Sequence, residues 1–368
     1  MNVLVPTAEA LPAGWPLLQG LLLLVFPLHL LAMNGLLGTT AVVLLIRRRN
    51  RPLDRALAPR LTASLPILMA LTINLGVASL LFSQTLYGQF FYPAAILMGR
   101  YWLAIIPLLM TAYAGLYMLD ADLAVFRSRP LPALCLILAL LLTVPFFFTN
   151  QQTTMLDLTH WRAYFSEDGG SLLNLKDPTV WPRYLHFMVA AMAVGGLFTA
   201  LTGRRLGRRN PPLGAYAERI GLRLFSRMTL LQFGIGILFL WQLPQPVRWF
   251  ILGGSLTGGL LLVAASGIAL AMLACAAQRL PGLCTVLLVM QVFVMSGLRE
   301  VVRHASLAGQ LLPANMPVLW QNGALLLFAT VLLAGVAVLV WLTRQAMRPP
   351  ATAVISETES EDDRAMRL

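Results

Sequence analysis

Long apolar stretches alternate with short polar segments along almost the whole chain. Most of these stretches are about 20 residues long, which is the length that a helix needs to cross a hydrocarbon core roughly 30 Å thick. The pattern predicts nine spans, at residues 16–45, 62–83, 95–118, 131–149, 184–202, 228–243, 250–276, 282–298 and 319–343. The sixth is the weakest because it is short and runs into the proline-containing segment WQLPQPVRWF. The chain is therefore predicted to be an all-α polytopic membrane protein.

Composition supports this class. Of the 368 residues, 58% are hydrophobic and only 11% are charged, whereas soluble domains contain about 45–50% apolar and about 25% charged residues. We expect one transmembrane helical domain over residues 1–345, with an outer loop at 150–183. Residues 346–368, which include SETESEDD, are predicted to be a disordered acidic tail on the inner side.

The distribution of basic residues predicts the orientation. If the N-terminus lies outside, only seven of the 27 Lys and Arg residues fall on the outer side, which leaves twenty on the inner side. Such an excess is typical of cytoplasmic loops, so the N-terminus is expected outside and the C-terminus inside. The net charge of +12 is then explained by arginines that face the anionic inner leaflet, and nucleic acid is not an expected partner.

Ionisable and polar side chains are concentrated towards the outer face. His29 lies about fourteen residues into the first span, roughly 20 Å along its axis, and no carboxylate lies in the middle of any span. A proton-coupled transporter usually needs acidic groups inside the bilayer, so this absence argues against one. The outer set consists of His29, Asn34, Asn74, Gln84, Gln89, Arg100, Arg183, His186, Arg248, Glu300, Arg303 and His304. Each residue at a helix edge is also explained as an interfacial anchor, whereas an ionisable group in mid-span, such as His29, is by default a functional candidate.

A b-type haem is one group that these residues suit. Neutral imidazole is an axial iron ligand, and Arg pairs with haem propionates. After His186 the sequence FMVAAMAVGG supplies small side chains at Ala190, Ala191, Ala193, Gly195 and Gly196, against which a flat macrocycle could pack. Close helix–helix packing explains the same small residues equally well.

Four stretches in chain order resemble the large, haem-bearing subunit of cytochrome bd quinol oxidases. FPLHLLAMNGLLGTT is similar to the opening helix of that family, TINLGVASLLF to its second span, RYLHFMVAAMAVGG to its fifth and REVVRHAS to the end of its eighth. The resemblance implies nine spans with the N-terminus outside in a bacterial inner membrane. It also implies that His29 and His186 bind haem iron, that Asn74 matches the second-span motif, and that Glu300 and Arg303 match a haem-ligating Glu and the Arg that follows it.

Several family features are absent. The third span, ILMGRYWLAIIPLLMTAYAG, has no carboxylate where the family carries two Glu residues of its oxygen-reducing site, and the family's long loop after the sixth span is reduced to LPQPVRW. Arg248 matches the Arg of an Arg-x-Met motif, but Phe250 stands in place of the Met. These departures favour a subunit that oxidises quinol or menaquinol near the outer face without reducing oxygen.

Such a subunit would be a quinol:cytochrome oxidoreductase component of a respiratory chain. Its electrons would pass from haem b to a periplasmic, multihaem cytochrome c or to a cytochrome-bearing subunit, and a second membrane subunit is a further expected partner. The outer loop, with Trp161, Tyr164, Phe165 and Trp181, is either the docking surface or an interfacial aromatic belt.

The quinol pocket has two predicted locations. Glu300 and His304 lie one turn apart on one helix face and form the first, although Glu300 cannot be both a quinol base and an iron ligand. The segment SQTLYGQFFY, with Gln84 and Tyr87, forms the second. Three other functions stay open: a true bd-type terminal oxidase, a haem-free quinol-interacting anchor, and a non-redox transporter.

Overall fold

The structure is a computed structural model that describes residues 4–121, 130–166, 169–310 and 312–347. These residues fall into two units, one ending at Val318 and the other beginning at Leu319. The predicted acidic tail lies outside the described residues from residue 348 onward.

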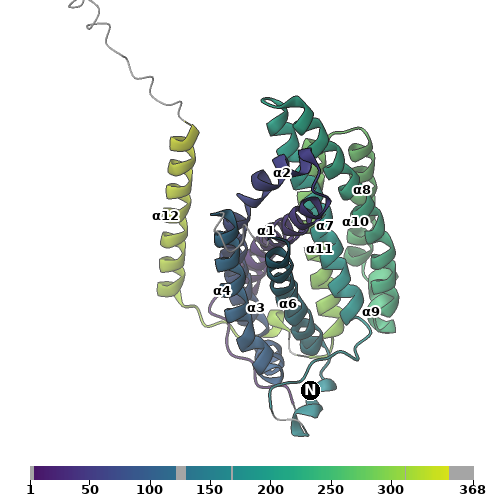
Figure 1. Ribbon diagram of the computed structural model, residues 1–368. Coiled ribbons are helices and arrows are strands. Elements are labelled where there is room, and N and C mark those ends of the chain that lie inside the picture. Colours follow the sequence, from purple (N-terminus) through teal and green to yellow (C-terminus); the bar gives the residue numbers. More distant parts are fainter. Residues whose placement is uncertain (1–3, 122–129, 167–168, 311, 348–368) are drawn as a thin grey trace, which may run out of the picture. The chain divides into compact units, whose positions relative to one another are not determined.

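Helices make up nearly all of the described chain (Figure 1). The first unit contains α1 (Trp15–Arg49), α2 (Pro52–Thr62), α3 (Leu65–Leu97), α4 (Gly99–Asp120), α6 (Pro130–Leu156), α7 (Val180–Gly207), α8 (Pro211–Gln242), α9 (Gln245–Trp249), α10 (Leu256–Ala277) and α11 (Pro281–Ser306). It also has two short 3₁₀-helices, η1 (His160–Phe165) and η3 (Pro313–Asn315), and a π-helical turn, η2 (Phe250–Gly254). The second unit contains α12 (Asn322–Met347).

The predicted class, an all-α polytopic membrane protein, is confirmed. In the described part of the chain, eight helical segments are long and apolar enough to cross a membrane, and Asn322–Val338 of α12 forms a shorter apolar helix. The helices begin and end where the sequence changes character. Proline occupies the first turn of α2, α3, α8 and α11, where its missing N–H costs nothing. α1 ends at three arginines and is capped by Asn50 in the left-handed conformation.

The sixth helix is twice as long as the predicted span 228–243. α8 runs from Pro211 to Gln242, so most of the segment expected to be an inner loop is helical. The reason is that Glu218, Arg219 and Arg223 interrupt the hydrophobic run without interrupting the helix, because Glu and Arg are good helix formers.

Helix α7 packs with its backbone in close contact with that of α1 on one side and that of α8 on another. A Cβ on Gly195 would come within 2.2 Å of the carbonyl carbon of Gly38, and one on Gly196 within 2.8 Å of the Gly221 oxygen. Small residues at such crossings are typical of membrane helices. Gly195 and Gly196 therefore allow the helices to pack closely. Of the two explanations for these glycines, packing against a haem or packing between helices, the second one holds.

Trp161 holds the described part of the outer loop against the helices. This indole is buried and donates from Nε1 to the carbonyl oxygen of Thr154 at 2.8 Å. Its aromatic neighbours Tyr164, Phe165 and Trp181 are exposed. Trp161 therefore anchors the loop and is not part of a docking surface, which corrects its predicted place there.

Candidate functional site

Glu300 lies at the centre of a buried ionic cluster on the last turns of α11. Arg299 donates from Nη1 to Glu300 Oε1 at 2.8 Å, and Arg303 donates from Nη1 to Glu300 Oε2 at 2.9 Å. The side chains of Arg299, Glu300 and Arg303 are only 17%, 14% and 3% exposed. Both carboxylate oxygens are thus held by charge-assisted hydrogen bonds, which are about twice as strong as neutral ones.

Three other helices supply the remaining partners of this cluster. From α6, Gln152 Oε1 accepts from Arg299 Nη2 at 2.8 Å and from Arg303 Nη2 at 3.4 Å. From α3, the Tyr87 hydroxyl lies 3.3 Å from Glu300 Oε2 and 3.4 Å from Gln19 Oε1 of α1. Both of these separations are long for hydroxyl hydrogen bonds. The Tyr87 hydroxyl is therefore loosely held and has room to exchange partners.

Aromatic rings complete the cluster. The guanidinium of Arg299 lies 4.3 Å from the ring centroid of Phe26, and that of Arg303 lies 4.4 Å from that of Tyr87. Contacts at this distance are attractive, by about 2 kcal/mol or more when the cation is desolvated. Tyr87 occupies this place at a break in α3, where its own backbone is non-helical (φ −130°, ψ 27°).

The cluster carries an excess of positive charge. Arg183 at the start of α7 lies close enough to both Arg299 and Arg303 to interact electrostatically with them. Its Nε is buried without a hydrogen-bond partner in the described structure, and its guanidinium lies 5.1 Å from the ring centroid of Phe239. Arg183 also interacts electrostatically with Asp177, so three arginines stand against two acidic side chains, and the net balance of +1 suits an anionic ligand.

His29 is held in one orientation on α1. Its Nδ1 lies 3.0 Å from the carbonyl oxygen of Thr72. Because a carbonyl only accepts, Nδ1 carries the proton, and Nε2 of the neutral ring is left as an acceptor. A Cβ on Gly76 would come within 2.8 Å of His29 Cε1, so only glycine leaves space for the ring. His29 is one turn from Phe26, with 6.5 Å between the ring centroids, and Phe26 links it to Arg299.

His186 lies one turn after Arg183 on α7. Its backbone carbonyl accepts from Gln232 Nε2 at 2.8 Å, whereas its ring Nδ1 is buried with no hydrogen-bond partner among the described residues. The nearest helix, α8, presents Gly236, whose added Cβ would lie 3.8 Å from His186 Cε1. A buried polar atom without a partner costs about 1–3 kcal/mol, so a bound group that engages this ring would relieve that cost.

The other predicted site residues lie apart from this cluster. His304 is exposed, and the described structure shows no hydrogen bond between it and Glu300. Asn74 is exposed and donates to the Ala70 carbonyl of its own helix. Arg248 donates to the carbonyl of Trp241 and stacks on its ring. Gln84 is half-buried on α3.

Sequence reasoning did not assign Arg299, Gln152 or Gln19 to the site. Arg299 precedes Glu300 directly, and Gln152 belongs to the run TNQQTT, which α6 carries into the interior, where most of this run is buried. A polar run that continues an apolar helix was the signal for Gln152. Gln19 gave no such signal, because only the fold brings the first turns of α1 next to α11.

These residues fit a haem better than a bare metal ion. Within the described ranges, no three or more His, Cys, Asp or Glu side chains are grouped as a metal ion would require. Haem supplies the equatorial ligands of its iron and needs only axial ones from the protein. His29 meets this need, since its protonated Nδ1 is bonded to a backbone carbonyl, as is usual for a ligating histidine. The arginines around Glu300 suit propionates.

Comparisons with known proteins agree with the architecture. No protein-family model matches the chain, and neither does any curated protein. Among solved structures, the chain is similar to a chain of the bd oxidase from Geobacillus thermodenitrificans, with a TM-score of 0.65 and 13% sequence identity. The similarity covers 90% of this chain and 98% of that one. The protein is therefore a multi-pass membrane protein with a bd-oxidase-like fold.

Proposed function

We propose that the protein is a haem b-binding membrane subunit that oxidises quinol near the outer face and passes the electrons to an acceptor outside the membrane. The observation that carries the proposal is the arrangement around His29. Its Nδ1 is hydrogen-bonded to the carbonyl oxygen of Thr72, and it lies one turn from Phe26, on whose ring Arg299 stacks. The bd-oxidase-like fold supports it, because the neighbour with this fold is named as an oxidase.

Each group has a defined role in this proposal. His29 and His186 would bind the haem iron, and Arg183, Arg299 and Arg303 would pair with its propionates. When bound, the haem would carry electrons one at a time. The protein holds it in an apolar environment in which few water molecules compete for the arginines, so each ion pair is stronger than at the surface.

We assign Glu300 to the quinol proton and not to iron. Both of its oxygens are engaged by Arg299 and Arg303, so an iron ion would have to displace an arginine. A quinol hydroxyl, in contrast, only has to replace the long contact from Tyr87 at 3.3 Å. Oxidation of quinol releases two electrons and two protons. Glu300 would accept the two protons one after the other, and each would leave on the outer side before the next is taken up, while the two electrons go to the acceptor outside the membrane.

The acceptor belongs to the same proposal. We infer a periplasmic cytochrome c or a cytochrome-bearing subunit, with the protein in a bacterial inner membrane. The exposed aromatic residues Tyr164, Phe165 and Trp181 form the contact surface. Aromatic residues are enriched at the centres of protein interfaces.

The test is a reduced-minus-oxidised spectrum of the purified protein, with the extracted haem measured as its pyridine complex. We expect at least one haem b per chain and loss of a haem signal in His29→Ala and in His186→Ala. His160→Ala, in the outer loop, is the matched control and should keep the full signal. Circular dichroism checks that each variant is folded.

Three results would contradict the proposal in different ways. A chlorin band together with oxygen consumption would identify a bd-type terminal oxidase. Absence of haem with retained quinol binding would identify a haem-free anchor of a redox complex. Full haem content in both histidine variants would show that the ligands are other residues.

A further inference from the structure

A charged cavity of about 360 Å³ lies where the end of α1, the start of α2 and the first turn of α6 meet. Arg47, Asn50, Asp54 and Arg55 line it on one side, and Pro130 and Leu131 of α6 line it on the other. The orientation predicted from the arginines places this cavity at the inner surface of the membrane, at the level of lipid head groups.

Two buried polar atoms at this cavity have no partner in the described structure. Asp54 is fully buried; its Oδ1 accepts from the Tyr216 hydroxyl, but its Oδ2 has no hydrogen bond. Arg47 Nε is likewise buried and unpartnered. A ligand that offers an acceptor to Arg47 and a donor to Asp54 would satisfy both atoms.

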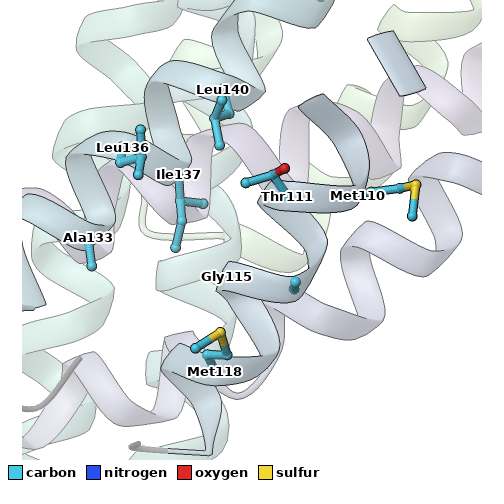
Figure 2. Close-up of a pocket in the computed structure, with 9 residues that line it drawn as sticks. Met110, Thr111, Gly115, Met118, Ala133, Leu136, Ile137 and Leu140 are labelled. Atoms are coloured by element: carbon cyan, nitrogen blue, oxygen red, sulfur yellow. The ribbon is translucent and has the colours of Figure 1, made fainter. Parts of the chain in front are cut away.

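An apolar groove of about 400 Å³ follows the same side of α6 (Figure 2). Ala133, Ile137 and Leu140 line it and continue the stripe of Pro130 at helical spacing. Pro130 and Leu140 lie about 15 Å apart along the axis. The facing wall is α4, with Thr111, Gly115 and Met118.

We propose that the cavity and the groove form one site for a glycerophospholipid with an anionic, hydroxyl-bearing head group, as in phosphatidylglycerol. Arg47 and Arg55 bind the phosphodiester, a head-group hydroxyl donates to Asp54 Oδ2, and an acyl chain lies in the groove. Two arginines and one acidic side chain line the cavity, so its lining favours an anionic phosphodiester. An ethanolamine head group would add a positive charge beside Arg47 and Arg55. Basic pockets between helices on the cytoplasmic side bind lipid head groups by this chemistry.

The first test removes the charges. The full-length protein is reconstituted with an equimolar mixture of phosphatidylglycerol and phosphatidylethanolamine, delipidated, and examined by native mass spectrometry for retained lipid. We expect Arg47→Gln/Arg55→Gln to retain about tenfold less phosphatidylglycerol than the wild type, or less still. Arg48→Gln/Arg60→Gln removes the same charge from exposed positions that do not line the cavity and should retain the wild-type amount. Equal retention by the two double variants would overturn the proposal.

The second test fills the groove. Ala133→Phe should lower the retention of phosphatidylglycerol, whereas Ala139→Phe, on an exposed face of the same helix outside the groove, should not. If Ala133→Phe has no effect and soluble glycerol phosphate binds as tightly as the lipid, the ligand is a soluble phosphate ester and the lipid assignment is wrong. Equal retention of phosphatidylethanolamine would refute the head-group assignment. Thermal unfolding of each variant separates these results from loss of the fold.

Discussion

At the scale of single residues, the fit between Gly76 and His29 is the most sensitive point of the candidate site. An added Cβ would lie 2.8 Å from His29 Cε1 and 3.0 Å from Nδ1, so Gly76→Ala forces the ring away from the Thr72 carbonyl. We expect this variant to lose or shift the absorbance signal of the haem that we assign to His29, because the ring loses the hydrogen bond that orients it. Redox titration followed by absorbance measures the change.

The control for this substitution lies on the same helix as His29. A Cβ on Gly20 would meet nothing within 4 Å, and alanine stabilises a helix by about 1 kcal/mol relative to glycine. Gly20→Ala should therefore leave the spectrum unchanged and the stability equal or slightly higher. An unchanged spectrum in Gly76→Ala as well would argue that His29 does not ligate haem.

At the scale of helices, the crossing of α1 and α7 depends on Gly38 and Gly195, since a Cβ on either would meet the backbone of the other helix or its neighbours. A backbone cannot move aside as a side chain can, so Gly195→Ala is expected to destabilise the protein by about 1–3 kcal/mol. Thermal unfolding in detergent measures this loss. Gly234→Ala, where a Cβ would meet nothing within 4 Å, should cause none, and equal melting temperatures would contradict the assigned crossing.

The sequence predicted the positions of the helices better than any other feature of the structure. Hydrophobic runs located the spans to within about four residues at α1 and α4, because the bilayer requires a long apolar helix. The runs could not predict the length of α8, where charged residues continue the helix beyond its apolar part. They also could not predict the break at Tyr87, because a single glycine, such as the adjacent Gly88, is tolerated inside a helix.

The candidate site was predictable only in part, for a related reason. The i,i+3 pairing of Glu300 with Arg303 follows from helix geometry alone. The contacts of Gln19, Gln152 and Phe26 with α11 do not, since they join residues far apart in the sequence. His304 was a reasonable partner for Glu300 by spacing, yet the described structure gives Glu300 two arginines and Tyr87 as partners.

At the scale of the whole molecule, fold and sequence have diverged to different extents. The chain shares only 13% identity with the bd oxidase chain that it resembles, and yet 90% of it follows the same architecture. A membrane fold tolerates such change because many apolar side chains satisfy the same lipid-facing position. The glycines where α7 crosses α1 and α8 do not tolerate such change, because an added Cβ would meet backbone there.

The position of the ionic cluster also bears on energy conservation. Glu300 and its arginines lie towards the predicted outer end of α11, and no carboxylate lies in the middle of a span. If quinol protons and electrons both leave on that side, turnover moves no net charge across the bilayer. A membrane potential, which acts on a transferred charge with about 2.3 kcal/mol per 100 mV, would then neither drive nor oppose the reaction.

In proteoliposomes with a soluble acceptor outside, we expect an imposed potassium diffusion potential of either sign to leave the rate unchanged. A rate that depends on voltage would show that charge crosses the membrane during turnover, and that a second, inner pathway exists.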